Sequence, residues 1–161
     1  MDLTAKRAAE SATEMVQVVL PNDANPLGFI LGGTVMHLID IAGAIACHRH
    51  TRSLLVTAAV DDLQFLHSIK VGDLIILKSH VTCVFTTSLE VQVDVFSEET
   101  LTGKRQMTST AFLTFVAIDK DGRRIPVPPL LVETEEARRV CEEAHRRRAQ
   151  RLKRKAAAEQ V

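Results

Sequence analysis

The sequence predicts an α+β fold in which a curved antiparallel sheet wraps around a long central helix. The first observation is an apolar, proline-free segment with helical spacing, from Gly33 to His50. A helix that is apolar nearly all round is buried on most of its sides. The second observation is a series of strand-like segments after this helix, each bounded by turn residues. One sheet can cover such a helix only by curling around it.

The segments before the helix are predicted in order as a flexible start, a strand and a loop. Residues 1–12 are polar and show no periodic pattern, which is typical of a fraying end. Thr13–Leu20 is rich in β-branched residues and alternates in part, as a strand does. Pro21–Leu27 contains Asn, Asp and Pro and is predicted to be a loop.

The central helix carries one carboxylate in its apolar length. Asp40 is the only formal charge between Thr34 and Cys47. Burial of an ionised carboxylate without partners costs several kcal/mol or more, so the chain either supplies partners or uses the group. Gly43 costs roughly 1 kcal/mol relative to alanine inside a helix, and we expect another backbone to approach closely there.

Four strands are predicted after the helix. Ser88–Phe96 alternates most cleanly and predicts a half-exposed antiparallel strand, with one apolar face and one polar face. Turn signals lie near Gly72, Gly103 and Gly122. The four predicted strands are Leu54–Phe65, Leu74–Val84, Ser88–Phe96 and Gln106–Ile118.

A charged helix is predicted from Val132 to about Ala158, after a proline-rich extended stretch. Its start is rich in Glu, and residues 138–155 hold nine Arg or Lys against two Glu, which complements the helix macrodipole. Thr134 is a candidate N-cap. The predicted organisation is therefore a flexible start at 1–12, a domain at 13–131 and a basic helical tail at 132–161.

Composition excludes several classes of protein. The chain has 20 basic and 20 acidic residues and no Trp or Tyr, which disfavours a nucleic-acid or membrane partner for the whole chain. The apolar run at 35–47 is too short to span a membrane. The scattered cysteines Cys47, Cys83 and Cys141 form no CxxC or Cys/His motif. We therefore expect three reduced thiols in a cytoplasmic protein, with no zinc site and no disulfide.

A homodimer is expected because a single sheet leaves one side of the helix and a sheet edge uncovered. A second copy of the chain would cover both.

Three segments resemble the hotdog-fold acyl-CoA thioesterases. PNDANPLGFILGG at 21–33 is similar to the family pattern P-x-D-x-N-x-x-G-x-x-x-G-G. The helix follows with LIDIAGAIA at 38–46, and VTAAVDDLQFLHSIKVGD at 56–73 is similar to the family strand, link and V-G-D. The resemblance covers roughly residues 14–127 and implies a hotdog fold. It also implies hydrolysis of fatty acyl-CoA to free acid and coenzyme A.

The resemblance implies a role for several residues. Asp40 would be the general base or the nucleophile, and Asn25 would orient the water or the thioester. Backbone N–H groups of Gly32 and Gly33, at the positive end of the helix, could hold the developing oxyanion. For each there is a structural alternative: an aspartate satisfied at a dimer seam, a turn asparagine and a tight loop-to-helix turn.

Other residues are implied in binding coenzyme A. Arg123 and Arg124 follow an Asp-Gly turn and could contact phosphates, although sheet surface and turn are equally good explanations for the whole group. The residues expected to line the pantetheine or acyl channel are Thr57, Thr86, Thr87 and Ser88. No metal or redox cofactor is expected, since coenzyme A is part of substrate and product. The family further implies a trimer of dimers, that is, a hexamer.

Two alternatives remain open at this point. A hotdog hydroxyacyl dehydratase would need a catalytic histidine with an acidic partner, and no helix histidine here is placed as that family requires. A non-enzymatic acyl-CoA sensor would use the same pocket, with the basic tail on nucleic acid. Acyl-chain preference depends on packing across the dimer and does not follow from the sequence.

Overall fold

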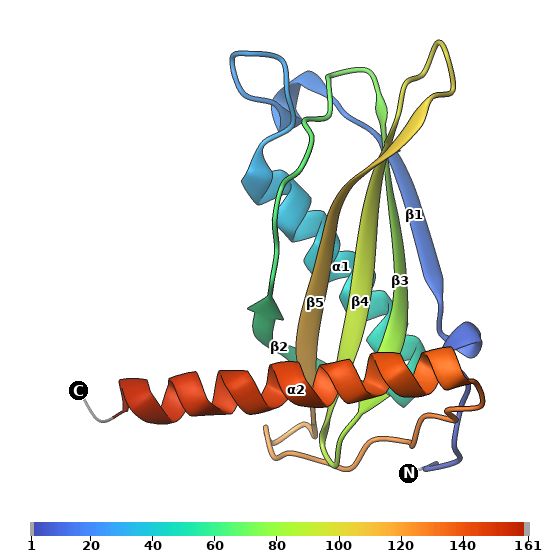
Figure 1. Ribbon diagram of the computed structural model, residues 1–161, viewed down its shortest axis with the longest axis vertical. Coiled ribbons are helices and arrows are strands. Elements are labelled where there is room, and N and C mark those ends of the chain that lie inside the picture. Colours follow the sequence, from blue (N-terminus) through green and yellow to red (C-terminus); the bar gives the residue numbers. More distant parts are fainter. Residues whose placement is uncertain (1, 160–161) are drawn as a thin grey trace.

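The computed structural model describes residues 2–159. One five-stranded antiparallel sheet has the strand order β1-β3-β4-β5-β2. Helix α1 runs along one face of the sheet, and helix α2 crosses the other face near the β3–β4 turn (Figure 1). The helices and strands are β1 Thr13–Val18, α1 Gly32–Thr51, β2 Leu54–Asp61, β3 Leu74–Val84, β4 Ser88–Glu98, β5 Arg105–Ile118 and α2 Glu135–Ala158, with short 3₁₀ turns at Ala8–Glu10 and Pro21–Asp23.

The predicted α+β architecture is confirmed, with one difference at β2. The strand was expected to continue to Phe65 but ends at Asp61, because Asp62 takes a left-handed backbone conformation with φ of 54°. The Thr134 cap of α2 is also confirmed, since its side chain accepts a hydrogen bond from the Ala137 N–H at 3.1 Å. Neither helix of the described chain has the length and apolar character that a membrane crossing requires.

The core lies between α1 and the concave face of the sheet. The four apolar residues predicted on one face of β4 are all fully buried there, namely Leu89, Val91, Val93 and Val95. A Cβ atom at Gly43 would lie 3.1 Å from Val91 Cγ1 and 3.2 Å from Phe115 Cε2. The close approach expected at Gly43 is therefore real, but it is made by side chains and not by another backbone.

The opposite face of β4 is less exposed than its alternation predicted, because α2 covers one end of it. Glu90 is 2% exposed, and its carboxylate accepts hydrogen bonds from Arg147 Nε at 2.9 Å and Nη2 at 2.8 Å. Thr82 Oγ1 donates a third bond at 2.7 Å, and the Arg147 guanidinium lies 3.7 Å from the Phe112 ring centroid. The carboxylate is thus buried with full compensation.

A second ion pair and a disulfide also join α2 to the sheet. Arg151 Nη1 donates to buried Asp61 at 2.6 Å. The Cys83–Cys141 disulfide links β3 to α2, and Cys47 is a buried free thiol. The expectation of three reduced thiols and no disulfide was wrong. The two cysteines are 58 positions apart in sequence, and only the docking of α2 makes them neighbours.

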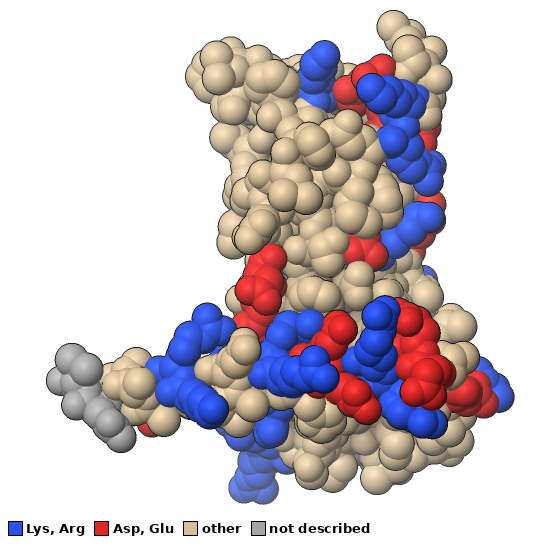
Figure 2. All heavy atoms as spheres, in the orientation of Figure 1, with Lys and Arg blue, Asp and Glu red and all other residues tan. Residues whose placement is uncertain are grey.

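The chain outside residues 13–131 has fixed contacts at both ends. The backbones of Lys6 and Leu130 form an isolated parallel β-bridge. The Lys6 Nζ also donates a hydrogen bond to the His50 carbonyl at 2.7 Å. Arg7 pairs with Glu133 at 2.7 Å. The segment expected to be flexible is thus hydrogen-bonded to the domain, and the predicted basic tail packs on the sheet with its charges gathered along α2 (Figure 2).

His50, at the end of α1, is fully buried, and only one of its two ring nitrogens is hydrogen-bonded within the described chain. Its Nε2–H donates to the Pro128 carbonyl at 2.9 Å. Its Nδ1 has no partner among the residues described. Burial lowers the pKa of His50, and burial also lowers the pKa of His80. Burial therefore favours the neutral form of both rings in the folded protein.

We expect Arg147→Ala to destabilise the protein by about 3–5 kcal/mol, because it leaves the Glu90 carboxylate buried without a counter-charge. Arg139 pairs with Glu136 on the exposed side of α2, so the matched change Arg139→Ala should cost less than about 1 kcal/mol. Chemical denaturation measures both free energies of unfolding. Equal losses would show that the Glu90 pair is not the contact that holds α2.

We also expect stability to fall as the pH is lowered below about 6.5, the ordinary value of histidine. The unfolded chain then binds protons that the folded chain, with its lowered pKa values, does not, so the unfolding free energy rises with pH in this window. The slope should reach about 1.4 kcal/mol per pH unit for each histidine involved. Urea titrations at several pH values test this, and His50→Gln, which keeps a donor for Pro128, should flatten the slope. A flat wild-type profile would contradict the assignment.

Candidate functional site

Asp40 lies on the less buried side of α1, beside the edge strand β2. The residues around it on this side are only partly covered, and Met36 is 47% exposed. Asp40 is itself partly exposed. Within residues 2–159 no Lys or Arg lies within ion-pair distance of it. The carboxylate is therefore neither buried in the core nor neutralised by a cation.

Thr57 on β2 is the residue that the structure brings to Asp40. Its Oγ1 donates a hydrogen bond to Asp40 Oδ1 at 2.7 Å. The pairing of β2 with β5 is irregular between Thr57 and Ala59, a β-bulge of the kind that re-aims a side chain. Thr57 was expected in the acyl-CoA channel, and no sequence signal linked it to the carboxylate. The bond occupies one carboxylate oxygen and leaves Oδ2 available.

Asn25 belongs to the loop before α1, and its oxygen is used inside that loop. Oδ1 accepts hydrogen bonds from the N–H of Leu27 at 3.0 Å and of Phe29 at 3.2 Å. This is the geometry of a turn asparagine. Its Nδ2 donates no bond within the described chain, so the amide N–H₂ remains available for another partner. The loop thus holds the side chain still while its donor is open.

Gly32 and Gly33 form the first turn of α1. The residue before them, Leu31, offers no side-chain cap, and the first helical bond is donated by Val35 to the Leu31 carbonyl at 3.1 Å. The N–H groups of the first turn therefore lack intrahelical acceptors and carry the positive end of the helix dipole. A Cβ atom at Gly33 would meet nothing within 4 Å, so an approaching group reaches the backbone freely.

A cavity of about 270 Å³ opens beside this turn. Gly32 forms part of its wall, and Phe65 packs close, 3.4 Å from where a Gly32 Cβ would stand. Ser109 on β5 also lines the cavity, and its buried hydroxyl has no hydrogen-bond partner among the residues described. No sequence signal pointed to Ser109, because a serine between two threonines in a strand has no distinguishing feature.

The predicted site residues fall into three separate places within one chain. Asp40 and Thr57 are in contact at the middle of α1 and β2. Gly33 lies about two turns earlier on α1, about 10 Å along the axis, with Asn25 in the loop near it. The remaining predicted residues lie at the opposite end of the sheet, in the β3–β4 turn and the turn after β5 (Figure 1); they are Thr86, Thr87, Ser88, Arg123 and Arg124.

The arrangement agrees with what comparison with known proteins finds. Residues 27–104 match the family model described as "Thioesterase superfamily". The chain is 42% identical over 127 residues to the uncharacterized acyl-CoA thioester hydrolase YkhA of Bacillus subtilis, covering 79% of this chain and 74% of that protein. The chain belongs to this superfamily. It is also 34% identical to the human cytosolic acyl coenzyme A thioester hydrolase over 83% of this chain, although it spans only 36% of that protein.

Solved structures of the superfamily show the same hotdog fold. A structure described as an apo-hexameric acyl-CoA thioesterase has a TM-score of 0.89 at 41% identity and covers 95% of this chain and 98% of its own. The acyl-CoA hydrolase of Staphylococcus aureus, in complex with butyryl coenzyme A, coenzyme A and coenzyme A disulfide, has a TM-score of 0.88 at 31% identity. That match covers 97% of this chain and 95% of the S. aureus chain. The predicted hotdog fold is thereby confirmed.

Three further structures of the S. aureus enzyme are single-alanine variants of an aspartate, an asparagine and a threonine. In that enzyme the asparagine precedes the aspartate by 15 positions, and the threonine follows it by 17. Asn25, Asp40 and Thr57 have the same two separations in this superfamily member.

Proposed function

We propose that this protein is an acyl-CoA thioester hydrolase in which Asp40 drives the attack on the thioester. The observation that carries the proposal is the Asp40 carboxylate, oriented by Thr57 at 2.7 Å on an uncovered side of an apolar helix. The shared separations of Asn25, Asp40 and Thr57 with the S. aureus enzyme support the same three residues.

The reaction we propose requires two subunits. The N–H groups near Gly33 are suited to hold an oxyanion, but in one chain they lie about 10 Å from Asp40 along the helix. We infer that the thioester carbonyl sits on the first turn of one subunit, near its Gly32 and Gly33. Asp40 and Thr57 then come from the other subunit. Asn25 would direct its free Nδ2 donor toward the thioester.

In the general-base form of the proposal, Asp40 Oδ2 takes a proton from water as the water oxygen attacks the carbonyl carbon. The C–S bond then breaks, the proton is delivered to the leaving sulfur, and the products are a carboxylic acid and the free thiol of coenzyme A. In the nucleophilic form, Asp40 itself attacks, and water then hydrolyses the resulting anhydride. Preorganised N–H donors are each worth about 2.7–4 kcal/mol in the transition state.

Binding of coenzyme A is proposed to use the opposite end of the sheet as well. Arg123 and Arg124 are exposed in the turn after β5, where guanidinium groups could pair with phosphates. Thr86, Thr87 and Ser88 lie in and beside the neighbouring β3–β4 turn. The substrate class is fatty acyl-CoA, and hydrolysis is proposed to use no cofactor.

A homodimer through α1 and β2 is proposed as the unit that completes the site. One edge of β2 pairs with β5 and the other faces no strand of the described chain. Its apolar residues Leu54, Val56 and Val60 are 56%, 45% and 44% exposed. A second copy would cover this edge and the uncovered side of α1. The hexameric relative supports three such dimers, and the cytosolic human relative supports a cytoplasmic location.

We expect Asp40→Asn to lower kcat/KM by about 10²–10⁴-fold, the range that positioned proton transfer contributes, while the fold and the oligomer persist. A thiol-release assay against acyl-CoAs of graded chain length measures the activity and gives the chain preference. Binding of a non-hydrolysable acyl-CoA thioether should be retained.

The matched control is Asp62→Asn, because Asp62 is exposed at the end of β2 in a left-handed conformation that asparagine accepts. Its turnover should be that of the wild type. Full turnover in the Asp40 variant would refute the role of Asp40. Binding without turnover in the wild type would instead identify a sensor, and loss of water from 3-hydroxyacyl substrates would identify a dehydratase.

We expect Val56→Lys to dissociate the dimer and abolish turnover, because it places a charge within the apolar edge of β2. Leu101→Lys is the matched control, since Leu101 is 98% exposed at the β4–β5 turn. Light scattering coupled to size-exclusion chromatography reports the assembly. An active monomer would contradict the shared site.

A further inference from the structure

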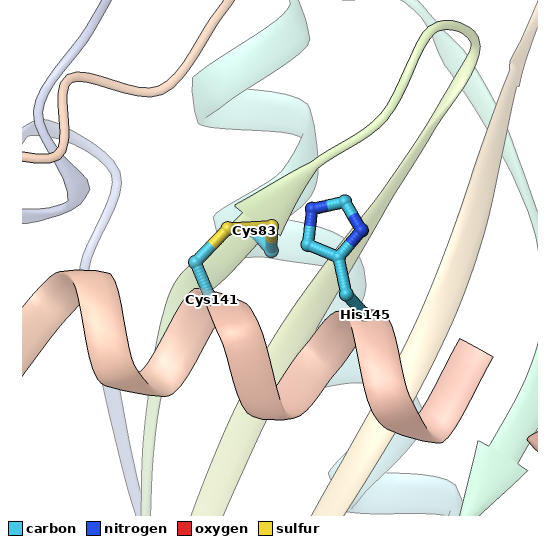
Figure 3. A group of neighbouring side chains, drawn as sticks. All are labelled: Cys83, Cys141 and His145. Carbon is cyan, nitrogen blue, oxygen red and sulfur yellow. A yellow bond between two sulfur atoms is a disulfide. The ribbon is translucent and has the colours of Figure 1, made fainter. Parts of the chain in front are cut away.

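Cys83, Cys141 and His145 form a cluster on the face of the sheet opposite Asp40. Cys83 lies on β3, and the other two lie on α2, with the imidazole beside the sulfur atoms (Figure 3). One potential ligand atom from each residue lies within 4.8 Å of the other two. No short sequence motif marks this cluster, because Cys83 and Cys141 are 58 positions apart in the chain.

The residue types and their spacing suit a soft divalent metal ion. Cys141 and His145 are four positions apart and therefore lie on one side of α2, one turn from each other. Cys83 faces them from β3, with a Cα–Cα distance of 4.8 Å to Cys141. Two thiolates and one imidazole are a ligand set typical of Zn²⁺ sites, which add a fourth ligand to reach tetrahedral geometry. Such a cysteine arrangement in a reducing compartment is more often a metal site than a disulfide.

We propose that the reduced protein binds Zn²⁺ through Cys83 Sγ, Cys141 Sγ and a ring nitrogen of His145, and that the disulfide and the metal complex are alternative states of one clamp. Each state ties α2 to β3. The proposal does not depend on the hydrolase activity, because α2 lies on the face of the sheet opposite α1.

The surroundings of the cluster have room for a fourth ligand and are compatible with the net charge of the metal complex. Cys141 and His145 both line a cavity of about 580 Å³ between α2 and the β3–β4 turn, from which water could complete the coordination. Zn²⁺ with two thiolates is formally neutral, so it places no net charge beside Arg148, which lies 4.8 Å from the Phe85 ring centroid. The His145 ring meets the same Phe85 edge-on at 5.0 Å, and this contact restrains the imidazole.

A peroxide can oxidise the metal-bound state to the disulfide state. Two cysteine thiolates and one hydrogen peroxide give one disulfide and two hydroxide ions. The S–S bond forms as the O–O bond breaks, and the two electrons pass from sulfur to oxygen. The metal ion leaves because both sulfur ligands are consumed.

The test uses the full chain, reduced and freed of metal with a chelator under anaerobic conditions, and titrated with Co²⁺ as the spectroscopic probe. We expect one equivalent to bind with thiolate-to-cobalt charge-transfer absorption and the visible bands of a tetrahedral site, and Zn²⁺ to displace it. Hydrogen peroxide should abolish these bands, with a mass loss of two hydrogen atoms and release of the metal. Absence of the thiolate band in the reduced wild type would overturn the proposal.

His145→Ala is the decisive variant, because His145 is exposed and its loss leaves both cysteines and the fold in place. Loss of an outer-shell partner already costs 10–100-fold in affinity, so we expect Co²⁺ binding to weaken by at least about 10-fold. Cys141→Ser should abolish the thiolate band. Burial raises the pKa of the Cys47 thiol in the core, and Cys47→Ala should bind Co²⁺ as the wild type does. Equal binding by the His145 variant would contradict a three-residue site.

Discussion

The structure depends on the burial of one apolar helix that is too large for a single sheet to cover. The concave face of the sheet covers one side of α1, where Ala42, Ala46 and Cys47 have no exposed surface. The other side carries Asp40 and remains open, next to the unpaired edge of β2. The free energy gained by hydrophobic burial is proportional to the apolar area removed from water. Because one side of α1 remains uncovered, its burial by a second subunit is favoured. The reactive carboxylate lies where that subunit would arrive.

The second organising contact is the docking of α2 on the opposite face. A helix with this many charges gains little from apolar burial, and its attachment rests on specific pairs. Glu90 would be costly to bury alone, and Arg147 with Thr82 compensates it through three hydrogen bonds. Asp61 with Arg151 and the Cys83–Cys141 link add two more fixed points. The face used for α2 is thus separated by the whole thickness of the sheet from the face that holds Asp40.

Much of the fold could be predicted from the periodicity of the apolar residues and from the turn residues. The errors in the prediction have local physical causes. The clean alternation of β4 correctly placed Val91 and Val93 in the core, but it predicted exposure for Glu90. A single sequence does not show which distant helix will cover a polar face. β2 ends early because Asp62 has a left-handed backbone conformation. The residues next to Asp62 in the sequence do not predict this conformation. Of the candidate site, Asp40 was recognisable as a lone charge in an apolar helix, whereas the unpaired Ser109 hydroxyl was not recognisable at all.

The sequence by itself determined the order of the elements, the central helix, the position of its carboxylate and the cap at Thr134. These depend on spacings of a few residues, which local chemistry sets. Only the tertiary structure decided that Thr57 bonds to Asp40, that Arg147 neutralises Glu90 and that Cys83 meets Cys141. These pairs join residues 17, 57 and 58 positions apart. Such contacts are set by how the sheet curves and where the helices dock, and these depend on the packing of the whole chain.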